Sequence, residues 1–341
     1  MKRILVTGGA GFIGSNFVRY LLKNSDYEVV NLDKLTYAGN LENLRDVEND
    51  PRYRFVAGDI CDTKAVEEAM RGCDGVVNFA AESHVDRSFG DTGEFIQTDV
   101  FGVYVLLTAA RQHDVERFLH ISTDEVYGPR FPTAPARETD MLAPANPYAA
   151  SKAGGEMQCQ AFFRSYGMPV IVSRSRNNIG PYQYPEKAIP LFVTNALEGK
   201  PLPVYGDGQQ IRDRFYVEDN CEALLMLLER GLPGEIYNVG ADNERSNMDV
   251  VETILELLEK PRDLIRFVQD RTLHDAQYSL DMSKVRAMGW KPRHDYRAAM
   301  EKTVAWYRDN PAWWQKIKSG EYAAYYEKHY AQRLANSKPA D

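Results

Sequence analysis

Cysteine is scarce in this chain of 341 residues, and no long hydrophobic run is present. The four cysteines, at positions 61, 73, 159 and 221, form neither a CxxC pair nor a cluster with histidine. This spacing argues against a disulfide framework or a metal site, so we expect reduced, packed side chains and no bound metal. No segment approaches the roughly 18 apolar residues of a membrane span, and the N-terminal run 4–7 is too short for a signal peptide. We therefore expect a cytoplasmic protein without a membrane anchor.

An excess of positive charge is also missing. The chain has 41 Lys and Arg against 49 Asp and Glu, a formal net charge of −8. Such a balance provides no basic field for nucleic acid, although it allows a small anion in one local pocket. Hydrophobic residues make up 44% and charged residues 26%, which is typical of a globular protein with about two domains' worth of chain.

Short β-branched runs alternate with helical stretches in the first half of the chain. Several of these runs lack polar residues at alternate positions, as in strands covered on both faces. We predict strands over residues 3–7, 28–33, 53–57, 75–80, 117–122 and 169–173. We predict helices over 12–23, 63–71, 95–113 and 148–166. This order is typical of an α/β fold with a Rossmann-type doubly wound parallel sheet.

The regular alternation ends near residue 180. Beyond it, proline-bearing loops separate helices predicted over 217–230, 248–258 and 297–310. We predict a Rossmann domain over 1–180 that carries the catalytic residues, a smaller mixed α/β substrate domain over 181–330, and a frayed tail over 331–341.

A glycine-rich turn directly follows the first predicted strand. Gly9, Gly11 and Gly14 form GxGxxG immediately before an apolar helix, the context that a dinucleotide fingerprint requires. Glycines allow close approach of a pyrophosphate to the helix N-terminus. Asp33 ends the second strand, where an acid accepts hydrogen bonds from the adenosine ribose and disfavours a 2′-phosphate. The sequence therefore predicts NAD rather than NADP, although Lys34 adjoins the acid; a glycine turn that binds nothing is the plainer alternative.

Two further segments suit the same cofactor. Asp59 and Ile60 follow the third strand, where an acid can contact adenine, and Phe79, Ala80 and Ala81 follow the fourth, where small side chains let a dinucleotide pass. Each feature alone is ordinary chemistry for the end of a strand.

Tyr148 and Lys152 lie four residues apart, hence on one face of the predicted helix. An ammonium close to a phenol lowers the phenol's pKa and makes it a usable general base for an alcohol. The pair alone also fits a surface helix. However, Thr123, Asp124 and Glu125 end the fifth strand, at the edge where doubly wound sheets bind ligands.

These motifs together resemble the nucleotide-sugar branch of the extended short-chain dehydrogenase/reductase superfamily, and within it the dTDP-glucose 4,6-dehydratases. The resemblance runs from residue 2 to about 325, and the Thr-Asp-Glu triplet is its most specific part. It is carried by residues 7–14 (TGGAGFIG), 33–41 (DKLTYAGNL), 80–88 (AAESHVDRS), 122–128 (STDEVYG), 148–152 (YAASK) and 180–187 (GPYQYPEK).

The resemblance implies a role for each catalytic residue. Tyr148 would take the C4 hydroxyl proton while NAD takes the hydride, and Lys152 would hold the phenolate and the nicotinamide ribose. Thr123 would bind the C4 oxygen, Glu125 would remove the C5 proton, and Asp124 would protonate the departing C6 hydroxyl. Hydride return to C6 would then complete an NAD-dependent lyase reaction.

The resemblance also implies two binding sets and a homodimer. The cofactor set is Gly8, Gly11, Phe12, Ile13, Gly14, Asp33, Lys34, Leu35, Thr36, Asp59, Ile60, Phe79, Ala80, Ala81, Ser83, Thr98, Tyr148, Lys152 and Asn178. The nucleotide-sugar set is Ser83, Thr123, Asn177, Lys187, Leu191, Pro203, Tyr205, Arg212, Asn247, Arg271 and His274. The dimer would form through a four-helix bundle made of helices 95–113 and 148–166 of each subunit. These helices carry more large apolar side chains than are needed to cover one face of the sheet, namely Phe101, Val105, Phe162 and Phe163. Alternatively, these side chains only cover the sheet.

The chain departs from the family pattern mainly in its second half. The departures are Arg176, Ile179, Arg214, Thr272, Leu273, Gln277 and the run 154–156 (GGE). They leave the nucleotide base and the hexose open, including UDP-glucose as substrate. Two other functions also stay open: a different nucleotide-sugar reaction, such as C4 epimerisation or UDP-uronate decarboxylation, and a non-catalytic NAD-sensing module. The first has no need of both Asp124 and Glu125, and the second has no need of Tyr148 and Lys152.

Overall fold

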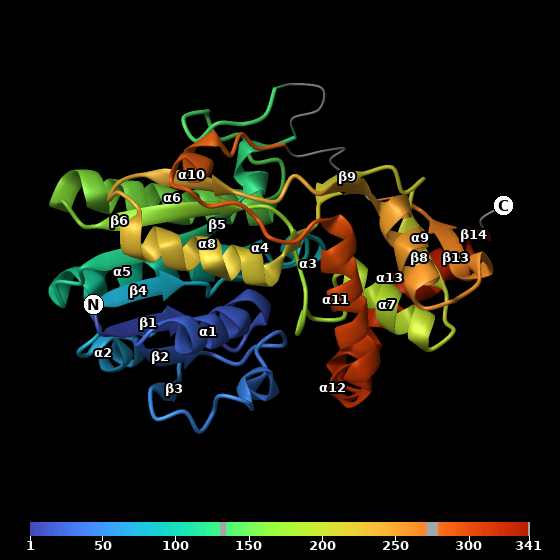
Figure 1. Cartoon of the computed structure of the whole chain (residues 1–341), viewed down its shortest axis with the longest axis horizontal. Helices are drawn as coiled ribbons and strands as arrows, with labels where there is room; N and C mark the ends of the chain where they lie inside the picture. The colour runs from blue at the N-terminus through green and yellow to red at the C-terminus, as the bar shows by residue number, and fades with distance from the viewer. Residues whose placement is uncertain (130–133, 271–278, 340–341) are drawn as a thin grey trace. The chain divides into compact units, whose positions relative to one another are not determined.

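The computed structural model describes residues 1–129, 134–270 and 279–339 and divides into two compact units (Figure 1). Unit 1 comprises Met1–Arg176, Glu218–Gly240 and Ser279–Lys291. Unit 2 comprises Asn177–Val217, Ala241–Tyr278 and Pro292–Asp341. The predicted boundary at residue 180 lies close to the first crossing between units. The chain then returns to unit 1 twice, so each unit is built from three separate segments, whereas the prediction had two consecutive domains.

A seven-stranded parallel sheet forms the centre of unit 1, with the strand order β11-β6-β5-β4-β1-β2-β3. Its strands are β1 (Arg3–Thr7), β2 (Glu28–Asp33), β3 (Tyr53–Ala57), β4 (Gly75–Asn78), β5 (Arg117–Thr123), β6 (Val170–Ser175) and β11 (Ile236–Val239). The order reverses between β1 and β4, and the carboxyl ends at this switch point are where doubly wound sheets bind ligands. The predicted Rossmann-type fold is confirmed.

Helices cover both faces of this sheet. They are α1 (Phe12–Asn24), α2 (Thr63–Met70), α3 (Val85–Ser88), α4 (Thr92–Ile96), α5 (Val103–Gln112), α6 (Pro147–Tyr166), α8 (Val217–Arg230) and α10 (Ser283–Ala287). Short helical turns are η1 (Leu41–Leu44), the π-helical η2 (Gln97–Gly102) and η3 (Asp124–Tyr127). In Figure 1, α1 and α8 lie across the face of the sheet nearest the viewer.

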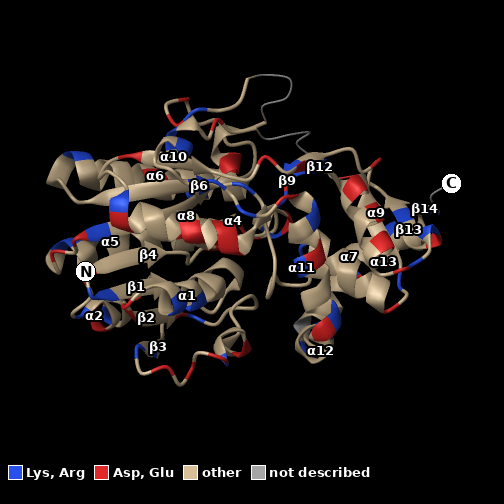
Figure 2. Cartoon of the chain, in the orientation of Figure 1, with Lys and Arg blue, Asp and Glu red and all other residues tan. Residues whose placement is uncertain are grey.

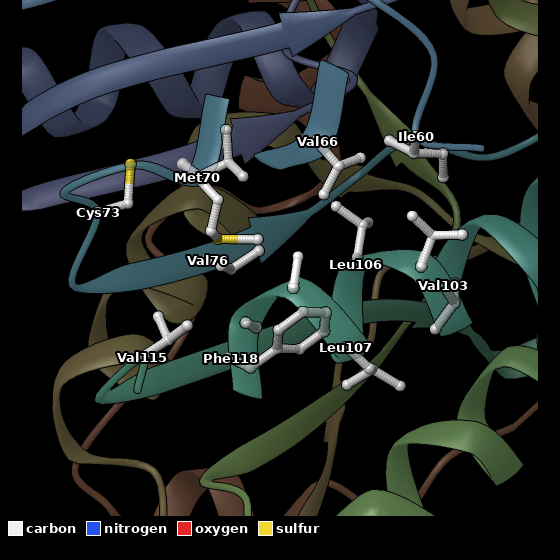
Figure 3. Packing of buried hydrophobic residues seen from close by; sticks show 14 of the residues in the cluster. Ile60, Val66, Met70, Cys73, Val76, Val103, Leu106, Leu107, Val115 and Phe118 are labelled. Atoms are coloured by element: carbon white, nitrogen blue, oxygen red, sulfur yellow. The ribbon is translucent and has the colours of Figure 1, made fainter. Parts of the chain in front are cut away.

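The opposite face of the sheet packs against α2, α5 and α6. Figure 3 shows Val66 of α2 and Leu106 of α5 lying close together near Val76 of β4, and all three are buried. Phe118 of β5 is also fully buried in this cluster. Because apolar side chains are buried on both faces of the sheet, the strand sequences are continuous runs of hydrophobic residues.

Unit 2 combines small sheets with helices around a separate core. Its strands are β7 (Asn178–Ile179), β8 (Leu202–Tyr205), β9 (Ile211–Asp213), β10 (Phe215–Tyr216), β12 (Glu244–Ser246), β13 (Ile265–Val268) and β14 (Lys338–Pro339). Its helices are α7 (Ala188–Leu197), α9 (Asn247–Leu257), η4 (Arg262–Leu264), α11 (Tyr296–Asp309), α12 (Pro311–Lys318) and α13 (Glu321–Ala335). Trp313, Trp314 and Tyr307 are buried among residues of α7 and α9. The region predicted as a frayed tail differs from that expectation, because α13 extends to Ala335 and β14 pairs with β13.

Charged residues of both signs are scattered along the chain, without a long stretch of either sign (Figure 2). Within the described ranges, no helix has the length and apolar character needed to cross a membrane. Nor do the described residues contain a group of three His, Cys, Asp or Glu side chains that could hold a metal ion. All four cysteines are free. The cytoplasmic location stays a prediction.

Candidate active site

The turn between β1 and α1 has the shape of a pyrophosphate cradle. Gly8 has a φ of +68°, and a Cβ there would lie 2.6 Å from the backbone nitrogen of Ala80. At Gly11 a Cβ would meet only the Gly8 carbonyl, at 3.3 Å, so this side of the turn is open. Gly11 is also the N-cap of α1 and supplies no side-chain hydrogen bond to its first turn. The turn therefore fits a dinucleotide whose phosphate takes up the N–H groups at the start of α1.

Asp33 connects the glycine turn to the segment after β2. Its carboxylate accepts hydrogen bonds from the backbone N–H of Ala10 and of Leu35, each at 2.8 Å. Burial raises the pKa of Asp33, while both hydrogen bonds act in the opposite direction. Lys34 forms an ion pair with Asp59 at 2.8 Å. The predicted ribose and adenine residues therefore lie together at the carboxyl ends of β2 and β3.

The segment after β4 closes the other side of the switch point. The N–H of Phe79 donates to the Thr7 carbonyl at 3.0 Å, and that of Ala80 donates to the Thr7 hydroxyl at 3.4 Å. Ala81 and Ser83 follow in the same segment, and Thr98 lies in the π-helical turn η2. Gly102 of η2 approaches Ile60 so closely that a Cβ would lie 2.6 Å from it. The backbone N–H of Glu82, in the segment after β4, donates to the Asp99 carboxylate of η2 at 3.0 Å, so η2 packs against the segments after both β3 and β4.

Three predicted catalytic side chains meet at the carboxyl end of β5. The Thr123 hydroxyl donates a hydrogen bond to Asp124 at 3.2 Å and accepts one from the backbone N–H of Glu125 at 3.3 Å. Through the second bond Thr123 acts as the N-cap of η3. The Thr123 side chain also acts on the Tyr148 phenol, whose pKa it lowers. The structure thus brings a hydroxyl, a phenol and a carboxylate together, and the hydroxyl donates a hydrogen bond to the carboxylate.

Helix α6 is aligned with this group by its N-cap. Asn146 accepts the N–H of Ala149 at 2.8 Å through its side-chain oxygen and donates to Glu125 at 3.1 Å through its side-chain nitrogen. Proline at the first helical position also favours a start here. One turn further, the buried Lys152 ammonium donates to the Ile121 carbonyl at 2.7 Å. A single residue therefore fixes both the helix that carries Tyr148 and the predicted base Glu125.

Burial dominates the electrostatics of the tyrosine and lysine pair. It raises the pKa of Tyr148 well above the usual value, and the charges of Glu125 and Asp99 act in the same direction. Burial also lowers the pKa of Lys152, while the Asp99 carboxylate opposes that shift. The direction for Tyr148 is opposite to the one expected from Lys152 alone, because burial and, after it, the charges of neighbouring carboxylates disfavour the phenolate.

The remaining predicted residues lie in unit 2. Asn247 begins α9; its side-chain oxygen accepts from Arg214 at 2.8 Å and its nitrogen donates to Gln210 at 3.2 Å. Burial, followed by the charge of Arg212, lowers the pKa of Arg214 to about 10. Other predicted residues of this unit are Asn177, Asn178, Lys187 at the N-cap of α7, Leu191 in the core, Pro203 in β8 and Tyr205, which contacts His329 and Arg333. Arg271 and His274 lie outside the described residues.

Comparison with known proteins identifies the family. The model of the GDP-mannose 4,6 dehydratase family matches residues 5–303. A dTDP-glucose 4,6-dehydratase from Neisseria meningitidis serogroup B is 51% identical to this chain, and the match covers 94% of this chain and 98% of that protein. The chain belongs to the dTDP-glucose 4,6-dehydratase family.

Solved structures agree with this dehydratase assignment. DesIV, a dTDP-glucose 4,6-dehydratase from Streptomyces venezuelae solved with NAD, has a TM-score of 0.90 and 46% identity, covering 93% of this chain and all (100%) of that one. A UDP-glucose 4-epimerase from Thermus thermophilus, also solved with NAD, has a TM-score of 0.83 and 32% identity, covering 90% of this chain and 99% of that one. The fold is thus shared across the superfamily, while the identity is higher toward the dehydratases.

Sequence reasoning overlooked several residues around the catalytic group of this dehydratase. Asn146 could have been found, since Asn followed by Pro before an apolar run is an N-cap signal. Asp99 and Ser151 had no such signal, because the hydrogen bond between them joins residues 52 positions apart.

Proposed function

We propose that the chain is an NAD-dependent hydro-lyase that converts dTDP-glucose to dTDP-4-keto-6-deoxyglucose. One observation carries the proposal: the Thr123 hydroxyl donates to Asp124, and Thr123, Asp124 and Glu125 all act on the pKa of the Tyr148 phenol. Oxidation of an alcohol needs one general base, and elimination of water needs a second base and an acid. A tyrosine beside two adjacent carboxylates supplies all three groups.

Each residue acts on a different atom of the hexose. Thr123 hydrogen-bonds the C4 oxygen and Tyr148 takes the C4 hydroxyl proton. NAD bound at the glycine turn would accept the C4 hydride and return it to C6. The C4 ketone makes the C5 proton acidic, so Glu125 removes that proton and Asp124 protonates the C6 hydroxyl as it leaves as water. Once C6 has received the hydride, Glu125 returns a proton to C5. The two carboxyl groups need opposite protonation states, as in other acid and base pairs.

Lys152 has a proposed role toward the cofactor, and residues of unit 2 have proposed roles toward the nucleotide. The Lys152 ammonium stabilises the phenolate form of Tyr148 and holds the nicotinamide ribose, as the family resemblance implies. Arg212 supplies a guanidinium suited to the substrate diphosphate. Asn247, whose amide is oriented by Arg214 and Gln210, would hydrogen-bond the nucleotide, as the family resemblance implies.

Single-turnover measurement at the NADH absorbance band separates the two chemical steps. Tyr148→Phe should abolish the NADH signal and lower kcat by roughly 10²–10⁴-fold, since nothing else takes the C4 proton. Glu125→Gln should still form NADH and a 4-keto-glucose species, while elimination becomes slow. Tyr27→Phe, which removes an exposed hydrogen bond to Glu229, is the matched control and should keep wild-type turnover.

The same assay with dTDP-glucose and with UDP-glucose tests which nucleotide the substrate must carry. We expect a 4-keto-6-deoxy product from dTDP-glucose at a higher kcat/KM. Wild-type turnover by Glu125→Gln or Asp124→Asn would contradict the dehydratase roles and favour an epimerase-like reaction. NAD binding without turnover of either sugar would favour a sensing module.

We further propose that the chain forms a homodimer through η2, α5 and α6. Phe101 and Tyr104 are 43% and 45% exposed with ring centroids 6.0 Å apart, and Met157 and Tyr166 of α6 are 48% and 55% exposed. An exposed set of large apolar side chains on neighbouring helical segments is typical of an interface between subunits. Of the four residues predicted for this role, Val105 and Phe162 are buried within the chain, and Phe163 packs at Gly234. Phe101 therefore stays a candidate, joined by Tyr104, Met157 and Tyr166.

A further inference from the structure

The side chain of Asn43 is buried against the glycine turn between β1 and α1. Asn43 belongs to η1 and is only 1% exposed. Its side-chain nitrogen donates a hydrogen bond to the backbone carbonyl of Ala10 at 2.8 Å, across 33 positions of sequence. The predicted cofactor set does not contain Asn43. A buried amide is costly unless hydrogen bonds compensate it, so this contact needs an explanation.

Three hydrogen bonds fix the backbone of Ala10. Its N–H donates to the Asp33 carboxylate at 2.8 Å. Its carbonyl accepts from the Asn43 side chain at 2.8 Å and from the backbone N–H of Asn40 at 3.0 Å. Ala10 lies between two glycines, and glycine permits many backbone conformations. The conformation of this part of the turn is therefore fixed by contacts from other segments of the chain.

The orientation of the Ala10 carbonyl matters for an anion at the start of α1. The N-cap of this helix is Gly11, so the peptide that joins Ala10 to Gly11 adjoins the helix N-terminus. A carbonyl oxygen carries partial negative charge, and a carbonyl directed at the N-terminus of α1 would repel a pyrophosphate. The contact with the buried Asn43 instead directs it into the protein interior. The N–H groups of the first helical turn then stay available to phosphate oxygens.

The segment between β2 and η1 brings Asn43 to this position. It packs closely on Asp33, since a Cβ on Gly39 would lie 2.8 Å from a carboxylate oxygen of Asp33. The Asn40 side chain caps η1 by accepting the backbone N–H of Glu42 at 3.0 Å, and the Asn40 carbonyl accepts the backbone N–H of Asn43 at 3.0 Å. The backbone of η1 thus has hydrogen bonds of its own, and the Asn43 side chain adds a direct link to the glycine turn.

We propose that Asn43 is a positioning residue for the dinucleotide. By holding the Ala10 carbonyl in the interior, it keeps the peptide between Ala10 and Gly11 in the orientation that leaves the N-terminus of α1 open to the pyrophosphate. The inference rests on the NAD site of the proposed function and adds η1 to the segments that recognise NAD. Asn43 itself acts on the cofactor only through Ala10.

Calorimetric titration with NAD tests this role. Asn43→Leu keeps the size of the side chain and removes the donor, so the Ala10 carbonyl loses a buried hydrogen bond and the Kd for NAD should rise roughly tenfold or more. Asn195→Leu is the matched control, because the Asn195 side chain is also buried and donates to the Pro201 carbonyl of unit 2 at 2.8 Å. This control should keep the wild-type Kd even if its free energy of unfolding falls. Wild-type affinity in Asn43→Leu would overturn the proposal.

Adenosine separates positioning of the turn from a general loss of structure. It carries the adenine and ribose of NAD but no pyrophosphate, so it does not use the N-terminus of α1. In an NMR titration, Asn43→Leu should weaken adenosine binding much less than it weakens NAD binding. An equal loss of affinity for both ligands would show that Asn43 only stabilises the unit, and the positioning role would be refuted.

The pH dependence of Asn43→Asp tests the donor itself. A carboxylate here accepts hydrogen bonds only and repels the Ala10 carbonyl, whereas a protonated carboxyl group donates to it. The Kd of this variant for NAD, divided by that of the wild type, should therefore be smallest at low pH and rise as the introduced group ionises. Asp33 faces the same peptide from β2 and titrates in both proteins, so its effect largely cancels in the ratio. A ratio independent of pH would contradict the role of the donor, even if Asn43→Leu does not fold.

These binding measurements need no turnover. Absence of NAD binding in the wild-type protein would contradict the proposed function and this inference together. Binding of NAD by the wild type that Asn43→Leu retains in full would contradict only the role of Asn43, so the two failures are distinguishable.

Discussion

At the scale of single residues, Asp33 has a structural role in addition to its proposed role in cofactor binding. Its two carboxylate oxygens hold the backbone of Ala10 in the glycine turn and of Leu35 after β2. Leu35 has a φ of +56°, which a leucine seldom adopts, so the hydrogen bond at its N–H helps to fix an unfavourable backbone.

Asp33→Asn should weaken NAD binding and reduce the preference for NAD over NADP. The amide keeps one acceptor oxygen and presents an N–H group to the other backbone donor, and it no longer repels a 2′-phosphate. Loss of a hydrogen bond to a charged group costs about 1.5–3 kcal/mol, so the Kd for NAD should rise by roughly tenfold or more in calorimetric titration. Asp46→Asn, which removes an exposed ion pair with Arg19, should bind NAD like the wild type. Equal affinity of wild type and Asp33→Asn for NAD would refute the role of Asp33.

At the scale of elements, the start of α6 couples stability to chemistry. Asn146→Ala should lower the free energy of unfolding by about 1 kcal/mol, because it removes the N-cap. It should also slow elimination, because Glu125 loses a hydrogen-bond partner. Asp295→Ala removes the cap of α11 and should cost similar stability with unchanged turnover. Chemical denaturation and single-turnover kinetics measure the two effects separately; normal elimination in Asn146→Ala would show that the contact with Glu125 has no catalytic role.

The same elements show what a sequence can and cannot predict. Helix α6 was predicted over 148–166 and spans Pro147–Tyr166, since Pro147 and Gly167, with a φ of +67°, mark its ends locally. The helix predicted over 95–113 instead consists of α4, η2 and α5. Its π-helical turn depends on packing against Gly154 and Gly155, which hydrophobic periodicity does not reveal. For the same reason spacing identified Tyr148 and Lys152, whereas Asp99 emerged only from the tertiary structure.

At the scale of the whole molecule, the exposed aromatic face of α5 and α6 makes association testable. Light scattering at micromolar concentration should give the mass of a dimer for the wild type. The double variant Phe101→Glu and Tyr104→Glu should shift the mass toward the monomer, because two charges would have to be buried in an apolar contact. Leu232→Glu, at a 63% exposed position outside this face, should leave the mass unchanged. A monomeric wild type would contradict the proposed dimer.

The discontinuous composition of unit 1 dictates when it can be completed during synthesis. When Arg176 has left the ribosome, β6 is present but its outer partner β11 is not, and α8 is still missing from one face of the sheet. The nascent chain thus carries an unpaired strand edge and uncovered apolar surface until residue 240 has emerged. The intervening stretch Asn177–Val217 belongs to unit 2 and is translated first. Because Asn177–Val217 is synthesised before β11 and α8, the sheet of unit 1 can be completed only after this part of unit 2 has been translated.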